Sequence, residues 1–391
     1  MKFFSAQYIF TNTSGPVKRG VIAAEDDGTI IGVEQNNGTL LEKHSVEFHN
    51  GIIVPGFVNC HCHLELSYLK NIIPQGNGLP DFLANISLKR HSVDTNKLKS
   101  IREADQEMYN EGVVLCADIC NDDSTFFLKK KSRIMYISLL EVFGIDSARA
   151  LNRMNDTISV SEKAKKMELP YFIVPHSVYS VSLELFRLIK KQSEANTFSS
   201  VHFLESAGEE QLLKSHTGPL MDAYRKFLSP FSELNIPGDH VSAVLNEMNP
   251  SGNLLLVHNT FIKRKHIHGL MNRKGIFWCL CPNSNLRIEN RVPPADLLVE
   301  EGCNITIGTD SLASNKSLSI LGEMKTLQDY FPEIPLEKLV RWSTLNGSIA
   351  LGKENEFGSI EPGKKPGLVL IKDADLQNLK ILPSTTVKRL I

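Results

Sequence analysis

The chain has 391 residues, of which 42% are hydrophobic and 22% charged, a balance typical of soluble globular proteins and not of disordered or fibrous ones. Its 43 basic and 44 acidic residues leave a formal net charge of -1, which argues against nucleic acid or an anionic membrane surface as a partner. No apolar run approaches the roughly 20 residues that a membrane-spanning helix needs. The composition therefore favours a protein that binds a small molecule.

The seven cysteines are an odd number spread over a long chain, without the density of a disulfide-bonded scaffold, which favours a reducing compartment. The opening residues resemble the start of a signal peptide, but Gln7, Tyr8 and Asn12 interrupt any apolar region and no small-residue cleavage site follows. We therefore expect a cytoplasmic protein, and the sequence leaves a homodimer open.

Residues 1–54 contain short β-type runs at Tyr8–Phe10, Val21–Ala23 and Thr29–Val33, with Asp27-Gly28 as a hairpin turn. The tail returns to this pattern, because a turn-rich stretch is followed by the β-type run Leu368–Ile371. We predict that residues 1–54 and 355–391 form one small, discontinuous, β-sandwich-like domain.

Between residues 55 and 354, buried-type apolar runs alternate with segments of helical length, a pattern typical of βαβ units around a parallel sheet. Eight such runs can be counted: Phe57–His63, Val113–Ile119, Ile134–Glu141, Phe172–His176, Ser200–Leu204, Leu254–His258, Ile276–Cys281 and Ile305–Thr309. Eight strands with intervening helices predict a (β/α)₈ barrel, an α/β fold. The basic run Lys129–Lys131 is interpreted as a solvated helix end.

The most informative polar residues stand at the ends of these runs, where a barrel enzyme builds its active site. His61 and His63 end the first run. Because side chains alternate along a strand, these two imidazoles project to the same side, while Cys60 and Cys62 face the other way. We therefore expect a pair of histidines that can share one ligand, and two cysteines that pack in the apolar interior without completing a four-residue zinc site.

Three later strand ends also carry a residue of the metal-binding type. His202 falls at the end of the fifth run, His258 ends the sixth, and Asp310 follows the eighth. Imidazole nitrogen and carboxylate oxygen suit a divalent metal such as zinc. Each residue alone is equally compatible with a core histidine or a helix-capping aspartate, but the ends of parallel barrel strands meet on one face, which favours a shared metal site.

A second His-x-His, His266 and His268, lies in a segment that we interpret as a helix. Residues two apart on a helix point about 200° from each other, so these two cannot share a metal and are expected at the surface. The remaining histidines fall in turn-like or polar segments and receive no role: His44, His49, His91, His216 and His240.

The string Pro55–Ser67, PGFVNCHCHLELS, resembles the first-strand motif of the amidohydrolase superfamily. Later segments follow the order typical of its aminohydrolase (deaminase) branch: Pro175–Ser180, His202-x-x-Glu205, His258, Cys281–Leu286, Gly308–Ser311 and Gly358–Lys364. The resemblance covers essentially the whole chain and implies a metal-dependent hydrolase on a distorted (β/α)₈ TIM-like barrel beside a β-sandwich-like domain. Within that branch, Asn59–Ser67 is most similar to aminofutalosine deaminase-like members.

The resemblance also implies roles for single residues. The implied metal ligands are His61, His63, His202 and Asp310. His258 would hydrogen-bond to the metal-bound water, and Glu205 would be the proton shuttle. Members with two metals use a lysine on the fourth strand to bridge the ions, whereas here that strand ends in His176. We therefore expect one divalent ion per chain, zinc before iron or manganese, with His176 either in contact with substrate or structural behind the site.

The chemistry of these groups is consistent with hydrolytic deamination. A bound divalent ion lowers the pKa of its water towards 7 and supplies hydroxide at neutral pH. When hydroxide attacks a ring carbon that bears an amino group, protons must reach the ring nitrogen and the departing amine, and Glu205 with Asp310 could move them. We predict deamination of an amino-substituted heteroaromatic ring of the adenine-nucleoside type. The alternatives are hydrolysis of a cyclic amide or of a halide-bearing ring, and a catalytically silent barrel that binds a ligand.

Further residues on the same barrel face are expected to contact the substrate. Glu65 continues the alternation of His61 and His63 and could face the pocket if the strand runs on. Loop residues that could shape specificity, or simply pack, are Tyr68, Tyr179, Asn283 and Arg287.

Overall fold

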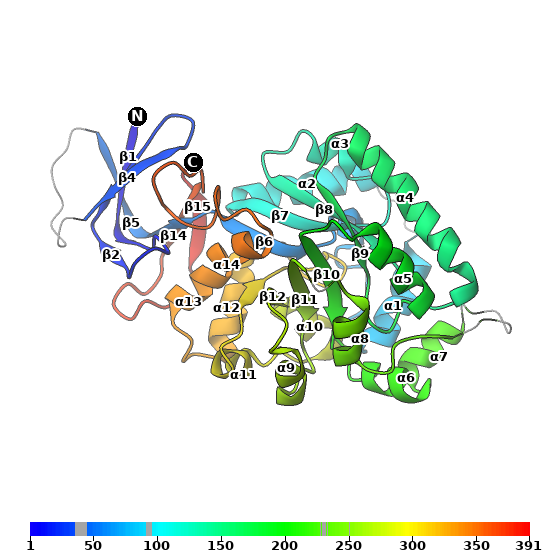
Figure 1. The fold of residues 1–391 in the computed structure, drawn as a ribbon. Coiled ribbons are helices and arrows are strands. Elements are labelled where there is room, and N and C mark those ends of the chain that lie inside the picture. Colours follow the sequence, from blue (N-terminus) through cyan, green and yellow to red (C-terminus); the bar gives the residue numbers. More distant parts are fainter. Residues whose placement is uncertain (36–44, 91–95, 227, 229–231, 233, 250) are drawn as a thin grey trace.

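The computed structural model describes residues 1–35, 45–90, 96–226, 228, 232, 234–249 and 251–391. His44 and His91 lie outside the described residues. Figure 1 shows a barrel with its helices around it, and beside it a smaller sheet that both termini join. No helix in the described part of the chain is both long and apolar enough to cross a membrane.

The smaller sheet is mixed and has seven strands, β1 (Lys2–Ile9), β2 (Val17–Lys18), β3 (Val21–Ala24), β4 (Ile30–Glu34), β5 (Val46–Pro55), β14 (Leu368–Lys372) and β15 (Thr386–Arg389). Six run in the order β15-β14-β5-β1-β3-β4, and β2 pairs with β1. The expected hairpin turn joins β3 to β4, with Gly28 at φ 89° and the Thr29 N–H bonded to the Asp27 carboxylate. The two termini therefore form one sheet, as predicted, and the proposed domain boundaries stay a prediction.

The barrel strands are β6 (Phe57–Cys62), β7 (Val113–Cys120), β8 (Met135–Val142), β9 (Tyr171–Pro175), β10 (Phe198–Phe203), β11 (Asn253–His258), β12 (Ile276–Leu280) and β13 (Ile305–Ile307). All eight coincide with the predicted runs to within a few residues. They form two parallel sheets, β6-β7-β8-β9 and β10-β11-β12-β13, which we call the first and second half-barrel. The predicted TIM-like α/β barrel is confirmed.

Short seams join the half-barrels, and both seams lie at predicted site residues. At one seam the His61 carbonyl accepts the N–H groups of Thr309 and Asp310, at 3.0 and 2.9 Å. At the other, the His202 N–H donates to the His176 carbonyl at 2.8 Å. Closure of the barrel therefore brings strand ends that are distant in sequence into contact.

The remaining elements are two 3₁₀ helices, η1 (Leu64–Leu69) and η2 (Ser147–Arg149), and fourteen α-helices within the described residues. These are α1 (Leu79–Lys89), α2 (Lys97–Asn110), α3 (Phe126–Lys129), α4 (Ala150–Lys166), α5 (Leu183–Gln192), α6 (Glu209–Ser215), α7 (Pro219–Arg225), α8 (His240–Glu247), α9 (Arg264–Leu270), α10 (Pro282–Glu289), α11 (Ala295–Glu300), α12 (Ile320–Tyr330), α13 (Leu336–Trp342) and α14 (Leu345–Ala350). Side-chain caps fix several starts, as where the Ser182 hydroxyl accepts the Leu185 N–H at α5.

Two surface predictions are wrong. Lys129 is buried, because its ammonium lies 2.6 Å from a carboxylate oxygen of Asp118, an acidic residue inside strand β7 that needs a counter-charge. Burial alone would lower the pKa of Lys129, but the Asp118 carboxylate holds it above its usual range. His266 is buried because its ring caps α9, accepting the Lys263 N–H at 3.1 Å.

Candidate metal centre and active site

Strand β6 places two imidazoles side by side. The Nε2 atoms of His61 and His63 lie 3.1 Å apart, and both side chains are buried. Cys60 and Cys62 are fully buried in apolar clusters, as the alternation of the strand predicts. The pair of histidines therefore faces one point at the barrel mouth.

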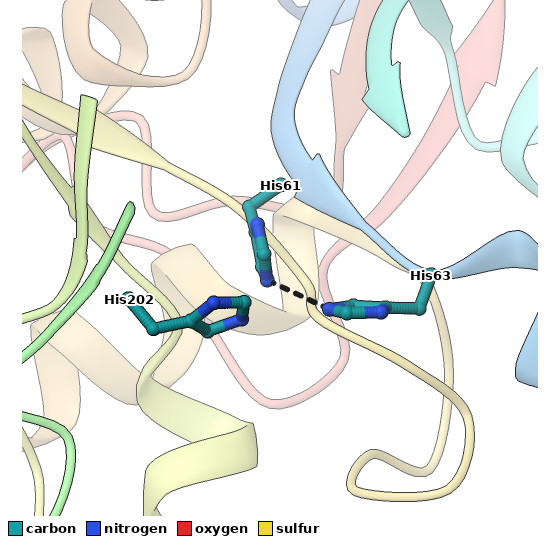
Figure 2. A group of neighbouring side chains, drawn as sticks. All are labelled: His61, His63 and His202. Carbon is teal, nitrogen blue, oxygen red and sulfur yellow. Dashed lines mark hydrogen bonds between the residues drawn. The ribbon is translucent and has the colours of Figure 1, made fainter. Parts of the chain in front are cut away.

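A third imidazole, that of His202, approaches from β10 in the second half-barrel (Figure 2). Its Nδ1–H donates to the His176 carbonyl at 2.6 Å, which leaves Nε2 as the atom with a free lone pair. One nitrogen from each of His61, His63 and His202 lies within 4.8 Å of the other two. The barrel seam thus sets both the position and the tautomer of this ring.

Asp310 completes the group from the turn after β13. Its Oδ1 lies 3.5 Å from Nε2 of His63 and 3.9 Å from Nε2 of His61. The hydroxyls of Ser284 and Ser314 donate to Oδ2, at 2.5 and 2.8 Å. These hydroxyls fix the carboxylate so that Oδ1 faces the histidines.

These four donors fit a divalent cation. Ligands at 2.0 to 2.2 Å around a tetrahedral ion lie roughly 3.3 to 3.6 Å from one another, close to the separations that involve Nε2 of His61, Nε2 of His63 and Oδ1 of Asp310. Burial and the neighbouring imidazoles hold the pKa of His61 well below its usual range, so the ring stays neutral, as a metal ligand must. The chain therefore carries a candidate metal site rich in histidine.

His258 and Glu205 face each other beside this group. The amide of Asn285 donates to Nδ1 of His258 at 3.1 Å, which places the ring proton on Nε2, 3.7 Å from a carboxyl oxygen of Glu205. Burial lowers the pKa of His258 to about 4. Burial, followed by the charges of Asp310 and Glu209, raises the pKa of Glu205 well above its usual range. The site therefore places a neutral imidazole beside a carboxyl group for which burial favours the protonated form.

His258 and Asp310 also share an unusual backbone conformation. Their φ angles are 79° and 58°, in the left-handed region that residues other than glycine rarely adopt. Such conformations persist only where surrounding contacts enforce them, and they gather at functional sites. Here they turn both side chains toward the histidine group.

A second acidic partner, Glu141 at the end of β8, was not predicted as a site residue. Its carboxylate lies 2.6 Å from Nδ1 of His176, and it also accepts the Asn121 amide at 3.0 Å. Burial alone would raise the pKa of Glu141, but His176 holds it below its usual range. The sequence held a signal, since the predicted third run ends in this acidic residue.

The site opens into a cavity of about 550 Å³. One wall is polar and includes Glu65, which accepts the Arg90 guanidinium at 3.0 Å and the Asn121 N–H at 2.9 Å. Burial raises the pKa of Glu65 to about 8, although Arg90 opposes this. The lining also includes apolar side chains of α1, those of Leu79, Phe82, Leu83 and Ile86.

The predicted substrate contacts divide into two groups. Glu65, Tyr179 and His176 line the cavity. The other three lie among the described residues outside its lining and contact protein groups instead: Tyr68 donates to the Arg90 carbonyl, Asn283 to the Glu323 carboxylate, and Arg287 to the Ile73 carbonyl. The cavity in this structure therefore leaves their contact with a substrate without support.

A candidate metal site rich in histidine at the mouth of a TIM-like barrel, beside buried imidazole and carboxyl groups, is typical of metal-dependent hydrolases. The model of the amidohydrolase family matches residues 52–389, so the chain belongs to that family.

Three relatives agree with this assignment. The chain is 26% identical to adenosine deaminase of Helicobacter pylori over 332 residues, which cover 82% of this chain and 79% of that protein. Aminofutalosine deaminase of H. pylori, solved with methylthio-coformycin, shares the fold with a TM-score of 0.83, 22% identity and 100% of both chains covered. An adenosine deaminase of Xanthomonas campestris with bound zinc gives a TM-score of 0.68 at 22% identity, with 98% of this chain and 86% of that chain covered. The predicted resemblance to the deaminase branch is confirmed.

Proposed function

We propose that the protein is a mononuclear, zinc-dependent aminohydrolase that removes the amino group from the adenine ring of a nucleoside. The observation that carries the proposal is the buried carboxyl group of Glu205, which lies 3.7 Å from Nε2 of His258 and beside the histidine group. The relatives that are named as adenosine deaminases support the same reaction.

One ion would be held by the ligands His61, His63, His202 and Asp310. When bound, it supplies an activated water that is a nucleophile at neutral pH. The fourth barrel strand, β9, ends at Pro175 and is followed by His176, so it offers no lysine to bridge a second ion. We infer zinc before iron or manganese, because neutral imidazole and carboxylate oxygen suit it.

The protein's own groups would handle the protons. Glu205 gives its proton to the ring nitrogen as the ring carbon is attacked, and it then regains a proton from the attacking water for the departing amine. His258 donates a hydrogen bond from Nε2 and keeps the oxygen nucleophile in line. His176, held by Glu141, presents the other edge of its ring to the cavity.

The lining of the cavity suits a nucleoside substrate that carries a substituent on its sugar. A purine and a ribose occupy the polar part, where Glu65 and His176 can meet sugar hydroxyls. The apolar side chains of α1 also line the cavity, and they suit a hydrophobic group on the 5′ carbon. The similarity to an aminofutalosine deaminase solved with methylthio-coformycin supports this arrangement.

The other candidate functions have less support. Opening of a cyclic amide, or loss of a halide, has less need of a buried proton donor such as Glu205. A catalytically silent barrel has no need to keep both Glu205 and His258 next to a complete ligand set.

The test is ammonia release by protein loaded with zinc, over a panel of adenosine, 5′-deoxyadenosine, 5′-methylthioadenosine and free adenine. We expect release from nucleosides, fastest with an apolar 5′ group, at one zinc per chain. Ring opening or dechlorination without ammonia from any purine would contradict the deaminase proposal, and full activity only with two tightly bound ions would contradict the mononuclear site.

A further inference from the structure

The loop that carries Glu205 is anchored by another buried carboxylate, that of Glu209. One oxygen of Glu209 accepts the Leu204 N–H at 3.1 Å, and the other accepts the Ser206 N–H at 2.8 Å. These two amides belong to the residues on either side of Glu205. A single fully buried side chain therefore holds the backbone before and after the proton-handling residue.

The Glu209 carboxylate has a third partner in His240, the first residue of α8. Nε2 of His240 lies 2.7 Å from the Glu209 oxygen that also accepts the Leu204 N–H. The His240 ring is buried and packs edge-on against the Phe203 ring of β10, with centroids 5.3 Å apart. Three donors thus satisfy a carboxylate that would otherwise be costly to bury.

The backbone at this loop needs such a restraint. Leu204 has a φ of 51°, in the left-handed region that a leucine rarely adopts. This turn directs the next side chain, Glu205, out of the line of strand β10 and toward Nε2 of His258. Without an anchor, the loop would relax toward ordinary backbone conformations and move the Glu205 carboxyl group.

We propose that Glu209 and His240 form a positioning pair that holds the Glu205 carboxyl group in place for proton transfer. This inference rests on the proposed function, because it takes the role of Glu205 from there. Glu209 does not line the cavity in the part of the chain that the structure describes, so it acts through Glu205 and not on the substrate. The sequence pattern assigns no role to either residue.

The neighbouring residue Glu210 provides a matched control. It lies next to Glu209 in α6, but its carboxylate faces away from Glu205 and pairs with Lys265 at 3.0 Å and His266 at 3.1 Å. Glu209→Gln and Glu210→Gln therefore make the same chemical change one residue apart. Only the first replaces one of the two oxygen atoms that accept the N–H groups of the Glu205 loop with an NH₂ donor.

Kinetics on protein loaded with zinc give the first readout. We expect Glu209→Gln to lower kcat by about 10- to 100-fold, with KM and zinc content near those of the parent, while Glu210→Gln behaves like the parent. In a Glu205→Gln background, Glu209→Gln should cause no further loss, because the residue it positions is already disabled. An equal fractional loss in both backgrounds would overturn the proposal, since a general structural defect has that signature.

Amide hydrogen exchange gives a second readout that does not depend on activity. We expect the Leu204 and Ser206 amides to exchange at least about tenfold faster in Glu209→Gln, and to be unchanged in Glu210→Gln. His240→Phe keeps a ring against Phe203 but removes the N–H group, so it should raise the exchange rates of the same two amides by a smaller factor. This variant takes the place of Glu209→Gln in the measurement if Glu209→Gln does not fold.

Unchanged exchange at both amides would also overturn the proposal. A parent protein that releases no ammonia from any nucleoside would instead refute the proposed function, and the exchange measurement would still decide whether the anchor exists.

Discussion

The two half-barrels supply two of the four proposed metal ligands each, but they balance their buried charges differently. In the first half-barrel, β6 to β9, the Asp118 carboxylate meets the Lys129 ammonium at 2.6 Å. Glu141 in the same half meets the His176 ring at 2.6 Å. Each of these carboxylates thus has a cationic or protonatable partner supplied by the protein.

The second half-barrel, β10 to β13 with the loops and helices that follow its strands, buries four carboxyl groups: Glu205, Glu209, Asp310 and Glu323. The groups that contact them are backbone amides, serine hydroxyls, asparagine amides and histidine rings. The comparison teaches that a lysine ammonium balances a buried carboxylate in the first half, whereas the four carboxyl groups of the second half contact neutral donors and histidine rings among the described residues. Of these four, Asp310 faces the candidate metal site, where a bound cation would supply positive charge.

The largest expected effect tests the proton-handling side of the second half. Glu205→Gln keeps the size of the side chain but cannot shuttle a proton, so ammonia release should fall by about 10² to 10⁴ while the metal is retained. His202→Ala is the comparison variant and should lose metal, activity and thermal stability together. Metal analysis and turnover are measured on both. Loss of metal in Glu205→Gln would make Glu205 a ligand instead.

Removal of the metal should affect the two half-barrels to different extents. A chelator withdraws the cation, and a ligand present at a thousand times its dissociation constant contributes about 4 kcal/mol to the free energy of unfolding. Because the Asp310 carboxylate then lacks the cation beside it, amides near His258 and Asp310 should lose more protection from hydrogen exchange than those of β7 and β8. Equal loss across both halves would remove the distinction.

The ion pair of the first half should matter for stability and not for the metal. Lys129→Met leaves the Asp118 carboxylate buried without its partner, which typically costs about 3 to 5 kcal/mol of unfolding free energy. Chemical denaturation with zinc present measures this cost. Lys130→Met is the control, because Lys130 is half exposed and pairs with the exposed Glu168; it should change stability by less than about 0.5 kcal/mol. A mild effect of Lys129→Met would mean that the first half is not internally compensated.

The smallest expected effects lie in α9, the helix of the second half-barrel that contains the second His-x-His. His268→Ala removes an exposed ring and should leave stability within about 0.5 kcal/mol of the parent. His266→Ala removes the buried cap of the Lys263 N–H and should cost about 1 kcal/mol. Thermal melts of the two variants measure these two losses of stability, and the metal content of each variant is measured as a check. A loss of metal from either variant would revive a role for this second His-x-His.

The barrel and the metal donors could be predicted because both follow from local patterns. Strand alternation places His61 and His63 together, and parallel strands bring His202 and Asp310 to the same face. Charge pairs such as Asp118 with Lys129, or Glu209 with His240, could not be predicted, because each depends on which helix end packs behind which strand. The acidic residue Asp118 inside an apolar run does indicate that a buried cationic side chain must lie near it, but it does not identify that side chain as Lys129.

The seams between the half-barrels have a consequence for how the chain is held together. His61 and Asp310 come from opposite ends of the barrel sequence, and the His61 carbonyl accepts the N–H groups of both Thr309 and Asp310 there. An ion shared by His61, His63, His202 and Asp310 would act as a removable cross-link between the two ends of the folded barrel. Because such a site rarely exists in the unfolded chain, the free energy of metal binding would add to the free energy of unfolding. The metal supply in the cell would then influence the free energy of unfolding of the barrel, and with it the lifetime of the folded protein.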